Sequence, residues 1–173
     1  MTALVLGFFA FSWFGWGQAA ASGALTVALG VGSLAAVVTA SWGAIQAFRR
    51  PSADSTLNDR DPWRRFGIVV GIEFAVAGLG AGVLGTAGAA DYIPVWICAV
   101  VGLHFFPLAS VFGDPALRWL GAAVTAVAGA ALLIHAWAGV APSTVTGAGA
   151  GVALLTFAIL ALTGPPRLRL SPR

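Results

Sequence analysis

Long apolar stretches separated by short polar turns make up most of this chain. A helix that crosses a membrane needs about 20 apolar residues, and six segments reach or approach that length. We therefore predict an all-α integral membrane protein, a single domain over residues 1–173 that forms a six-transmembrane-helix bundle. The predicted helices cover approximately 2–18, 23–47, 66–87, 92–112, 116–137 and 145–163.

The polar positions between these segments predict the orientation of the bundle. The only long hydrophilic stretch runs from 48 to 65, and a second group of arginines follows the last apolar segment. With six crossings and cytoplasmic N and C termini, every arginine falls on or beside the cytoplasmic face, as the positive-inside rule requires. The arginines are at positions 49, 50, 60, 64, 65, 118, 167, 169 and 173. We expect a multi-pass protein of a bacterial inner (plasma) membrane.

The first segment has an alternative interpretation as a cleaved signal peptide, because small residues follow it at 19–21. A signal peptide begins with a positively charged region, and no basic residue precedes Arg49. The pattern therefore favours a first membrane helix.

Composition agrees with lipid as the solvent. Hydrophobic residues make up 59% of the chain and charged residues 9%, whereas a soluble domain has about 25% charged residues. The 23 glycines are typical of helices that pack closely in a membrane. We expect membrane lipids as partners and no nucleic acid, and a homo-oligomer is compatible with the pattern. Cys98 is the only cysteine, which excludes an internal disulfide.

Two polar residues inside predicted helices are the strongest candidates for chemistry. Glu73 lies eight residues beyond Arg65, and His104 lies eight residues before Phe112. At 1.5 Å per residue, each is about 12 Å from the same end of its helix. Intramembrane polar groups are costly and usually functional, and an isolated carboxylate there takes up a proton. We predict that Glu73 and His104 are catalytic. The alternative is a structural role, in which both only bond neighbouring helices or backbone carbonyls.

Substrate-binding candidates come from two patterns. Small residues follow Glu73 at helical spacing, which predicts a face directed toward other helices or a cavity. The aromatic side chains of the first helix either face lipid as bulky apolar groups or line an apolar cavity in which their rings stabilise a cation. The predicted substrate-binding residues are Ser12, Trp13, Phe14, Ala77, Gly80 and Phe105.

Metal and haem sites are not expected. His135 lies near the opposite membrane surface beside Trp137, which is typical of an aromatic belt. Its depth differs from that of His104 by about a dozen ångströms, which disfavours a bis-histidine haem. With two histidines, one glutamate and one cysteine, we predict no metal site and no cofactor.

The box Gly102-Leu103-His104-Phe105-Phe106-Pro107-Leu108-Ala109, with Glu73 and Tyr92-Ile93-Pro94 upstream, resembles a group of small bacterial multi-pass membrane proteins of uncharacterised function. The resemblance implies a shared helical membrane fold and brings no activity with it. Signatures of alcohol phosphotransferases, Gly-x-Ser-x-Gly hydrolases, Walker-type nucleotide sites and Cys-x-x-Cys proteins are missing from the sequence.

Three functions fit these observations. The first is a membrane-embedded enzyme that acts on a lipophilic, isoprenoid-like substrate by acid–base chemistry from Glu73, such as a proton-initiated isomerisation or a terpene-cyclase-like cyclisation. The second is a proton-coupled small-molecule transporter, or a substrate-binding membrane subunit similar to those of vitamin importers. The third is an accessory subunit of a membrane complex, in which Glu73 only supports packing.

Overall fold

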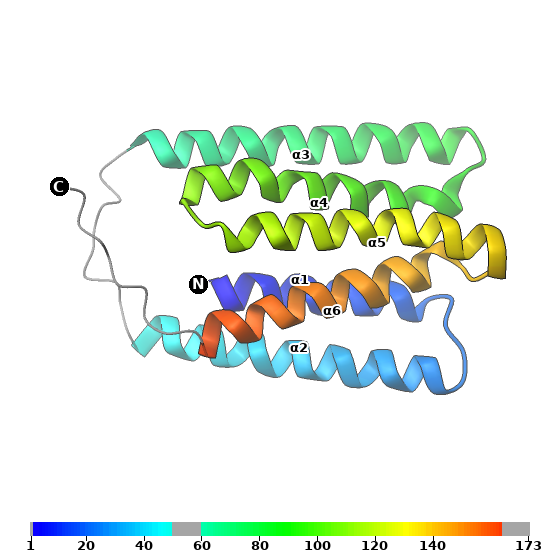
Figure 1. Ribbon diagram of the computed structural model, residues 1–173, viewed down its shortest axis with the longest axis horizontal. Coiled ribbons are helices and arrows are strands. Elements are labelled where there is room, and N and C mark those ends of the chain that lie inside the picture. The colour runs from blue at the N-terminus through cyan, green and yellow to red at the C-terminus, as the bar shows by residue number, and fades with distance from the viewer. Residues whose placement is uncertain (1, 50–59, 164–173) are drawn as a thin grey trace.

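The computed structural model of this protein describes residues 2–49 and 60–163, and within them all regular structure is helical. Six long helices follow one another and reverse direction at each turn (Figure 1). They are α1 (Thr2–Gln18), α2 (Ala24–Arg49), α3 (Arg60–Thr86), α4 (Ile93–Phe112), α5 (Ala116–Ala138) and α6 (Pro142–Thr163), with a short 3-10 helix, η2 (Ala90–Tyr92), before α4.

Five of these helices, α2 to α6, are long and apolar enough to cross a membrane. The remaining helix, α1, has 17 residues and is about 25 Å long at 1.5 Å per residue. The hydrocarbon core of a bilayer is about 30 Å thick, so α1 falls slightly short of it. The helices therefore indicate a membrane protein.

The helices pack in two groups of three. One group consists of α3, α4 and α5, and the other of α2, α1 and α6 (Figure 1). The groups join where α5 and α4 meet α6, and the outermost helices are α2 and α3. Glycines permit the closest approaches. A Cβ atom added at Gly147 on α6 would lie against the backbone of Gly17 on α1, as expected for helices that associate in lipid through small residues.

Side-chain hydrogen bonds also link neighbouring helices. Gln18 donates through Nε2 to Ser33 Oγ at 3.0 Å, which joins α1 to α2. The Cys98 thiol donates to the Val124 carbonyl at 3.4 Å, which joins α4 to α5. The buried core is largely apolar, with fully buried side chains such as Leu120, and it also contains the Thr146 hydroxyl, which donates to the Pro142 carbonyl.

The outer surfaces are apolar, as a lipid environment requires. Leu34 on α2 is 65% exposed and Leu79 on α3 is 73% exposed. Two exposed tryptophans, Trp119 and Trp137, lie near opposite ends of α5. Their separation of 18 residues corresponds to about 27 Å of helix, close to the thickness of the hydrocarbon core. Tryptophans at both membrane surfaces are typical of spanning helices.

The described arginines cluster at one end of the bundle. Arg49 ends α2, Arg60 begins α3 and is followed by Arg64 and Arg65, and Arg118 lies in the first turn of α5. Figure 1 shows that these helix ends lie together, at the end that also holds the N terminus of α1. Arg50, Arg167, Arg169 and Arg173 lie outside the described residues.

Two helices begin earlier than the sequence pattern predicted. The helix α3 begins at Arg60 rather than at 66, and α6 begins at Pro142 rather than at 145. Proline is well tolerated at the first helical position, because the backbone N–H that it lacks would have no helical partner there. The segment Pro142-Ser143-Thr144, which we expected to be a turn, is therefore the first turn of α6.

Candidate acid–base site between α3 and α4

The side chains of Glu73 and His104 meet at the interface of α3 and α4. Glu73 Oε2 lies 3.1 Å from His104 Nδ1. The two side chains are 14% and 10% exposed, respectively. The spacing of both residues from the arginine-bearing end predicted equal depth, and the structure adds the helix rotation that turns them toward each other.

Aromatic contacts fix the register of the two helices on both sides of this pair. Toward the arginine-bearing end, the rings of Phe66 and Phe112 are 5.8 Å apart. Toward the other end, the Trp96 indole N–H donates to the Val76 carbonyl at 3.2 Å, and its ring covers Gly80. These contacts and the Glu73–His104 pair follow in order along antiparallel helices, so one register satisfies all of them.

The two atoms are close without being aligned as a hydrogen bond. Their separation is that of an ion pair, but His104 Nδ1 has no hydrogen-bond partner of good geometry among the described residues. The imidazole nitrogen and the carboxyl oxygen therefore lie close enough to exchange a proton after a small rotation of either side chain.

Within residues 2–49 and 60–163, the pair is enclosed chiefly by the two helices that carry it. Along its length α3 packs chiefly on α4, with further contacts to η2 near its end. The opposite face of α3 is exposed, including Ile72 and Phe74 on either side of Glu73 in the sequence. The pair thus lies away from the two ends of the bundle, where water has access. It lies at the flank of the molecule, next to the surface that faces acyl chains.

The substrate-binding candidates on α3 and α4 share this region, but two of them have other neighbours. Ala77 and Gly80 lie on the half-buried face of α3 that carries Glu73. The space above Gly80 is filled by the Trp96 ring, so no substrate atom fits there unless the ring moves. Phe105 is buried, and its Cβ lies close to Gly121 on α5; its ring is also 5.7 Å from that of His104.

The candidates on α1 lie in the other group of helices. Trp13 and Phe14 are buried in the core, and the Phe14 ring rests on Gly32 of α2 and Gly151 of α6. Ser12 is exposed and donates to the Phe8 carbonyl of its own helix. Because α1 packs chiefly on α2 and α6, the structure does not bring these residues to Glu73.

Sequence reasoning missed the contribution of Trp96, which holds α3 in place through Val76 and Gly80. It also interpreted His135 as a surface anchor, although His135 and Asp91 line one pocket at the end of the bundle opposite the arginines. The available signal was positional, because both residues fall near the predicted turns on the side without arginine. In the part of the chain with described side chains, no three His, Cys, Asp or Glu residues gather into a metal-binding group.

Comparison of the chain with protein-family models, with curated proteins and with solved structures gives no significant match.

Proposed function

We propose that this protein is a six-span protein of a bacterial inner membrane, with both termini in the cytoplasm. The arginine-bearing end is then the cytoplasmic end, in agreement with the positive-inside rule. In this arrangement α1 is a short sixth crossing, supported by its close packing on α6 at Gly17 and Gly147. Glu73 and His104 then lie about 12 Å inside the membrane from the cytoplasmic helix ends.

We further propose that the protein is a membrane-embedded enzyme that moves protons on a lipid-soluble, isoprenoid-like substrate. The observation that carries this proposal is the 3.1 Å contact between Glu73 Oε2 and His104 Nδ1 on the flank of the bundle. A substrate dissolved in the acyl chains reaches this flank laterally, without crossing an aqueous channel. Intramembrane carboxyl and imidazole groups in contact are costly to retain without a role.

The residues present fit a redox-neutral isomerisation. Glu73, as the neutral acid, donates a proton to one carbon of a C=C double bond, and a carbocation forms on the other carbon. His104 Nδ1 removes a proton from a carbon next to the cation, and the electrons of that C–H bond form the new double bond. The proton then passes from His104 to the Glu73 carboxylate and restores both groups. The ring of Phe105 lies 5.7 Å from that of His104, where an aromatic ring stabilises a cation.

Deuterium incorporation tests this function and requires no choice of substrate in advance. The purified protein is reconstituted into nanodiscs with lipids extracted from its native host membrane and incubated in D2O. A proton-initiated isomerisation adds carbon-bound deuterium, which high-resolution mass spectrometry detects in one lipid class. We expect Glu73→Gln to lower the labelling rate by about 100- to 10,000-fold, the usual contribution of a general acid. His104→Ala should slow labelling as well.

Asp114→Asn is the matched control, because it removes a carboxylate in the turn between α4 and α5, away from the pair. It should label at the wild-type rate. Undiminished labelling by Glu73→Gln would contradict the proposal, and so would the lack of any labelled lipid with the wild-type protein. In the second case, proton flux driven by an added solute in the same bilayers would favour the transporter instead.

A further inference from the structure

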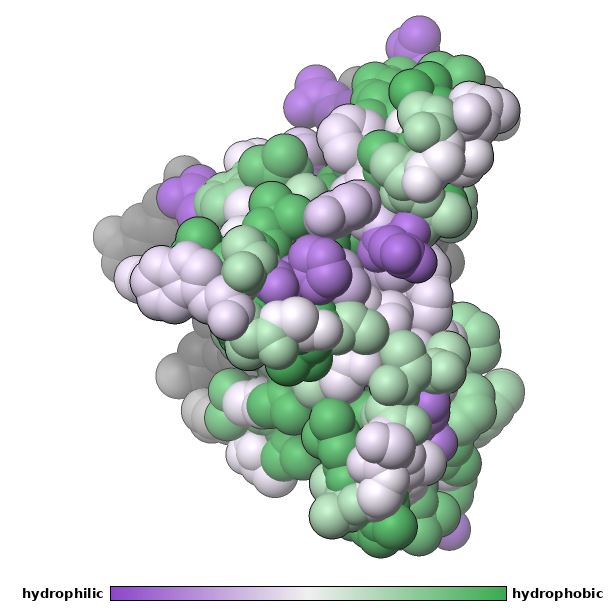
Figure 2. Space-filling model, turned by 90° about the vertical axis from the view of Figure 1, so that its right-hand side faces the viewer, coloured by the Kyte–Doolittle hydropathy of each residue, from purple (hydrophilic) through white to green (hydrophobic). Residues whose placement is uncertain are grey.

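A pocket of about 410 Å³ lies at the end of the bundle opposite the described arginines. Its walls come from the last turn of α1, from η2 and the start of α4, and from the turn between α5 and α6. Figure 2 looks onto this end and shows hydrophilic side chains gathered near the middle of a largely apolar and weakly polar surface. The volume is that of a site for a small molecule, and Glu73 and His104 do not line it.

The charge in this pocket is negative. Asp91, which is exposed in η2, is the only charged side chain near this end among the residues whose side chains are described. The helix dipoles offset one another, because the N termini of α4 and α6 and the C termini of α1 and α5 all meet here. The Asp91 carboxylate therefore sets the sign of the local potential.

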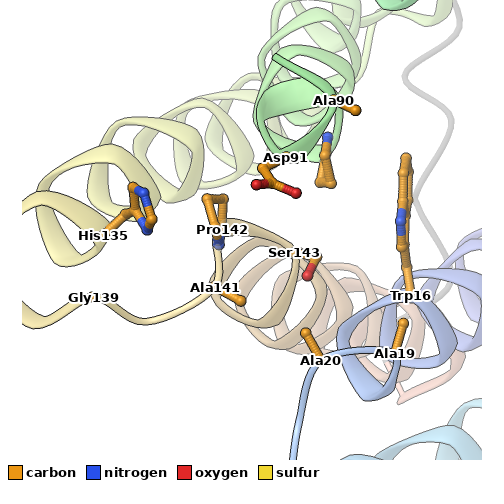
Figure 3. A pocket seen from close by; sticks show the side chains of 11 residues that line it. Trp16, Ala19, Ala20, Ala90, Asp91, His135, Gly139, Ala141, Pro142 and Ser143 are labelled. Atoms are coloured by element: carbon orange, nitrogen blue, oxygen red, sulfur yellow. The ribbon is translucent and has the colours of Figure 1, made fainter. Parts of the chain in front are cut away.

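An aromatic ring forms another wall of the same space. Trp16 stacks on Trp13, with ring centroids 5.5 Å apart and planes inclined by 27°, and this contact holds the indole in place. Figure 3 shows the Asp91 carboxylate, the Ser143 hydroxyl and the Trp16 ring around one cavity. Tryptophan is the aromatic side chain that binds cations best, and substituted ammonium ions are typical ligands of such rings.

His135 shapes the pocket through a hydrogen bond and a ring contact. Its Nδ1 lies 2.9 Å from the Val140 carbonyl. A carbonyl only accepts, so Nδ1 carries the hydrogen, and in the neutral ring Nε2 keeps its lone pair. The Tyr92 ring meets the imidazole edge-on at 5.7 Å. These contacts tie the turn between α5 and α6 to η2 and preform one side of the pocket.

We propose that this pocket binds a small organic cation, a substituted ammonium ion, between the Asp91 carboxylate and the Trp16 ring. The remaining lining, which includes Pro94 and Pro142, is apolar and accommodates alkyl groups on the nitrogen. A bare metal ion such as Ca²⁺ fits poorly, because one carboxylate, one hydroxyl and one imidazole leave most of its coordination positions empty. This site is independent of the proposed acid–base function and stands without it.

Calorimetry with choline on the purified full-length protein in nanodiscs tests the proposal. The uncharged carbon analogue dimethylbutanol has the same shape and isolates the contribution of the charge. The wild-type protein should bind choline, and it should bind dimethylbutanol much more weakly or not at all. Trp16→Leu should weaken choline binding by roughly 2- to 30-fold, as expected for loss of a cation–π contact. Asp91→Asn should weaken it by up to about 5-fold, as expected for an exposed ion pair, and the double variant should bind least.

Matched controls lie near the arginine-bearing end, where Trp119→Leu removes an exposed tryptophan and Asp114→Asn removes a carboxylate. Both should bind choline as the wild type does. Asp91 is exposed, so its variant keeps the test valid even when Trp16→Leu fails to fold. Equal binding of choline and dimethylbutanol, preferential binding of acetate, or unchanged affinity in every variant of Asp91→Asn and Trp16→Leu that folds would overturn the proposal.

Discussion

Gly80 gives the sharpest test of the interface that positions Glu73 against His104. A Cβ atom added there would overlap the indole of Trp96 and would lie 2.6 Å from Cζ2, which is not even the nearest ring atom. The ring would have to retreat by roughly 1.5 Å to bring its nearest atom back to ordinary van der Waals contact. That retreat lengthens the hydrogen bond from the indole N–H to the Val76 carbonyl, which now measures 3.2 Å. Gly80→Ala therefore strains the contact between Trp96 and α3, which lies farther along α3 than the Glu73–His104 pair.

The same helix supplies controls for helix propensity. Gly78 and Gly82 flank Gly80, and a Cβ added at either position meets nothing within 4 Å. All three Gly→Ala variants gain the same helix propensity, so their differences isolate the clash. Overpacking costs about 1–3 kcal/mol, and an interhelical hydrogen bond in a membrane contributes about 0.6 kcal/mol. We expect Gly80→Ala to be less stable than either control by about 1–3 kcal/mol.

Reversible unfolding in mixed micelles, followed by circular dichroism as the SDS fraction rises, measures these differences. The replacement Trp96→Leu should remove most of the penalty of Gly80→Ala in the double variant, because the clashing ring is gone. If Gly80→Ala unfolds at the same SDS fraction as Gly78→Ala and Gly82→Ala, then Trp96 does not lie on Gly80, and the register of α3 on α4 described above is wrong.

Two further predictions concern the rest of the bundle. Gly147→Ala places its Cβ against the backbone of α1, which cannot rotate away, so the variant should lose about 3 kcal/mol or more of stability. The control Gly15→Ala, whose added Cβ meets nothing within 4 Å, should change stability by at most about 0.5 kcal/mol in the same SDS titration. Equal losses of stability in the two variants would contradict the close α1–α6 crossing. The buried Cys98 thiol should stay unreactive toward a membrane-impermeant maleimide, so any labelling reports an introduced cysteine. Ala19→Cys should be labelled in intact cells, and Asp114→Cys should be labelled only after permeabilisation. The reverse pattern would contradict cytoplasmic placement of the arginine-bearing end.

Hydropathy predicted the helices well, because in lipid each spanning segment must satisfy its own backbone and stay apolar over its length. It predicted the starts of α3 and α6 less well. Residues 60–65 are mostly polar, which predicts a loop, yet they form the start of α3, before the apolar segment. Pro142 reads as a turn residue, yet it begins α6, since proline at the first position costs a helix nothing.

The equal distance of Glu73 and His104 from the arginine-bearing ends of their helices also followed from sequence, because helical rise is constant. Their contact did not follow, because it depends on the rotation of α3, which Trp96 and Gly80 fix. The aromatic residues of α1 show the same limit. The sequence of an apolar helix gives little information on which helix it packs against. The packing of α1 on α6 depends on glycines that allow close approach. Trp13 and Phe14 therefore lie in the core of the other group, away from the pair.

The contact between Glu73 and His104 is open to direct measurement, because the chain has only two histidines. In protein labelled with ¹⁵N-histidine and reconstituted in bilayers, solid-state NMR resolves the ring nitrogens of His104 and His135. His135 Nδ1 is bonded to Val140 and serves as an internal reference. We predict that Glu73→Gln shifts the ring signals of His104 and leaves those of His135 in place. Unchanged signals from both rings would contradict the contact and remove the basis of the proposed acid–base function.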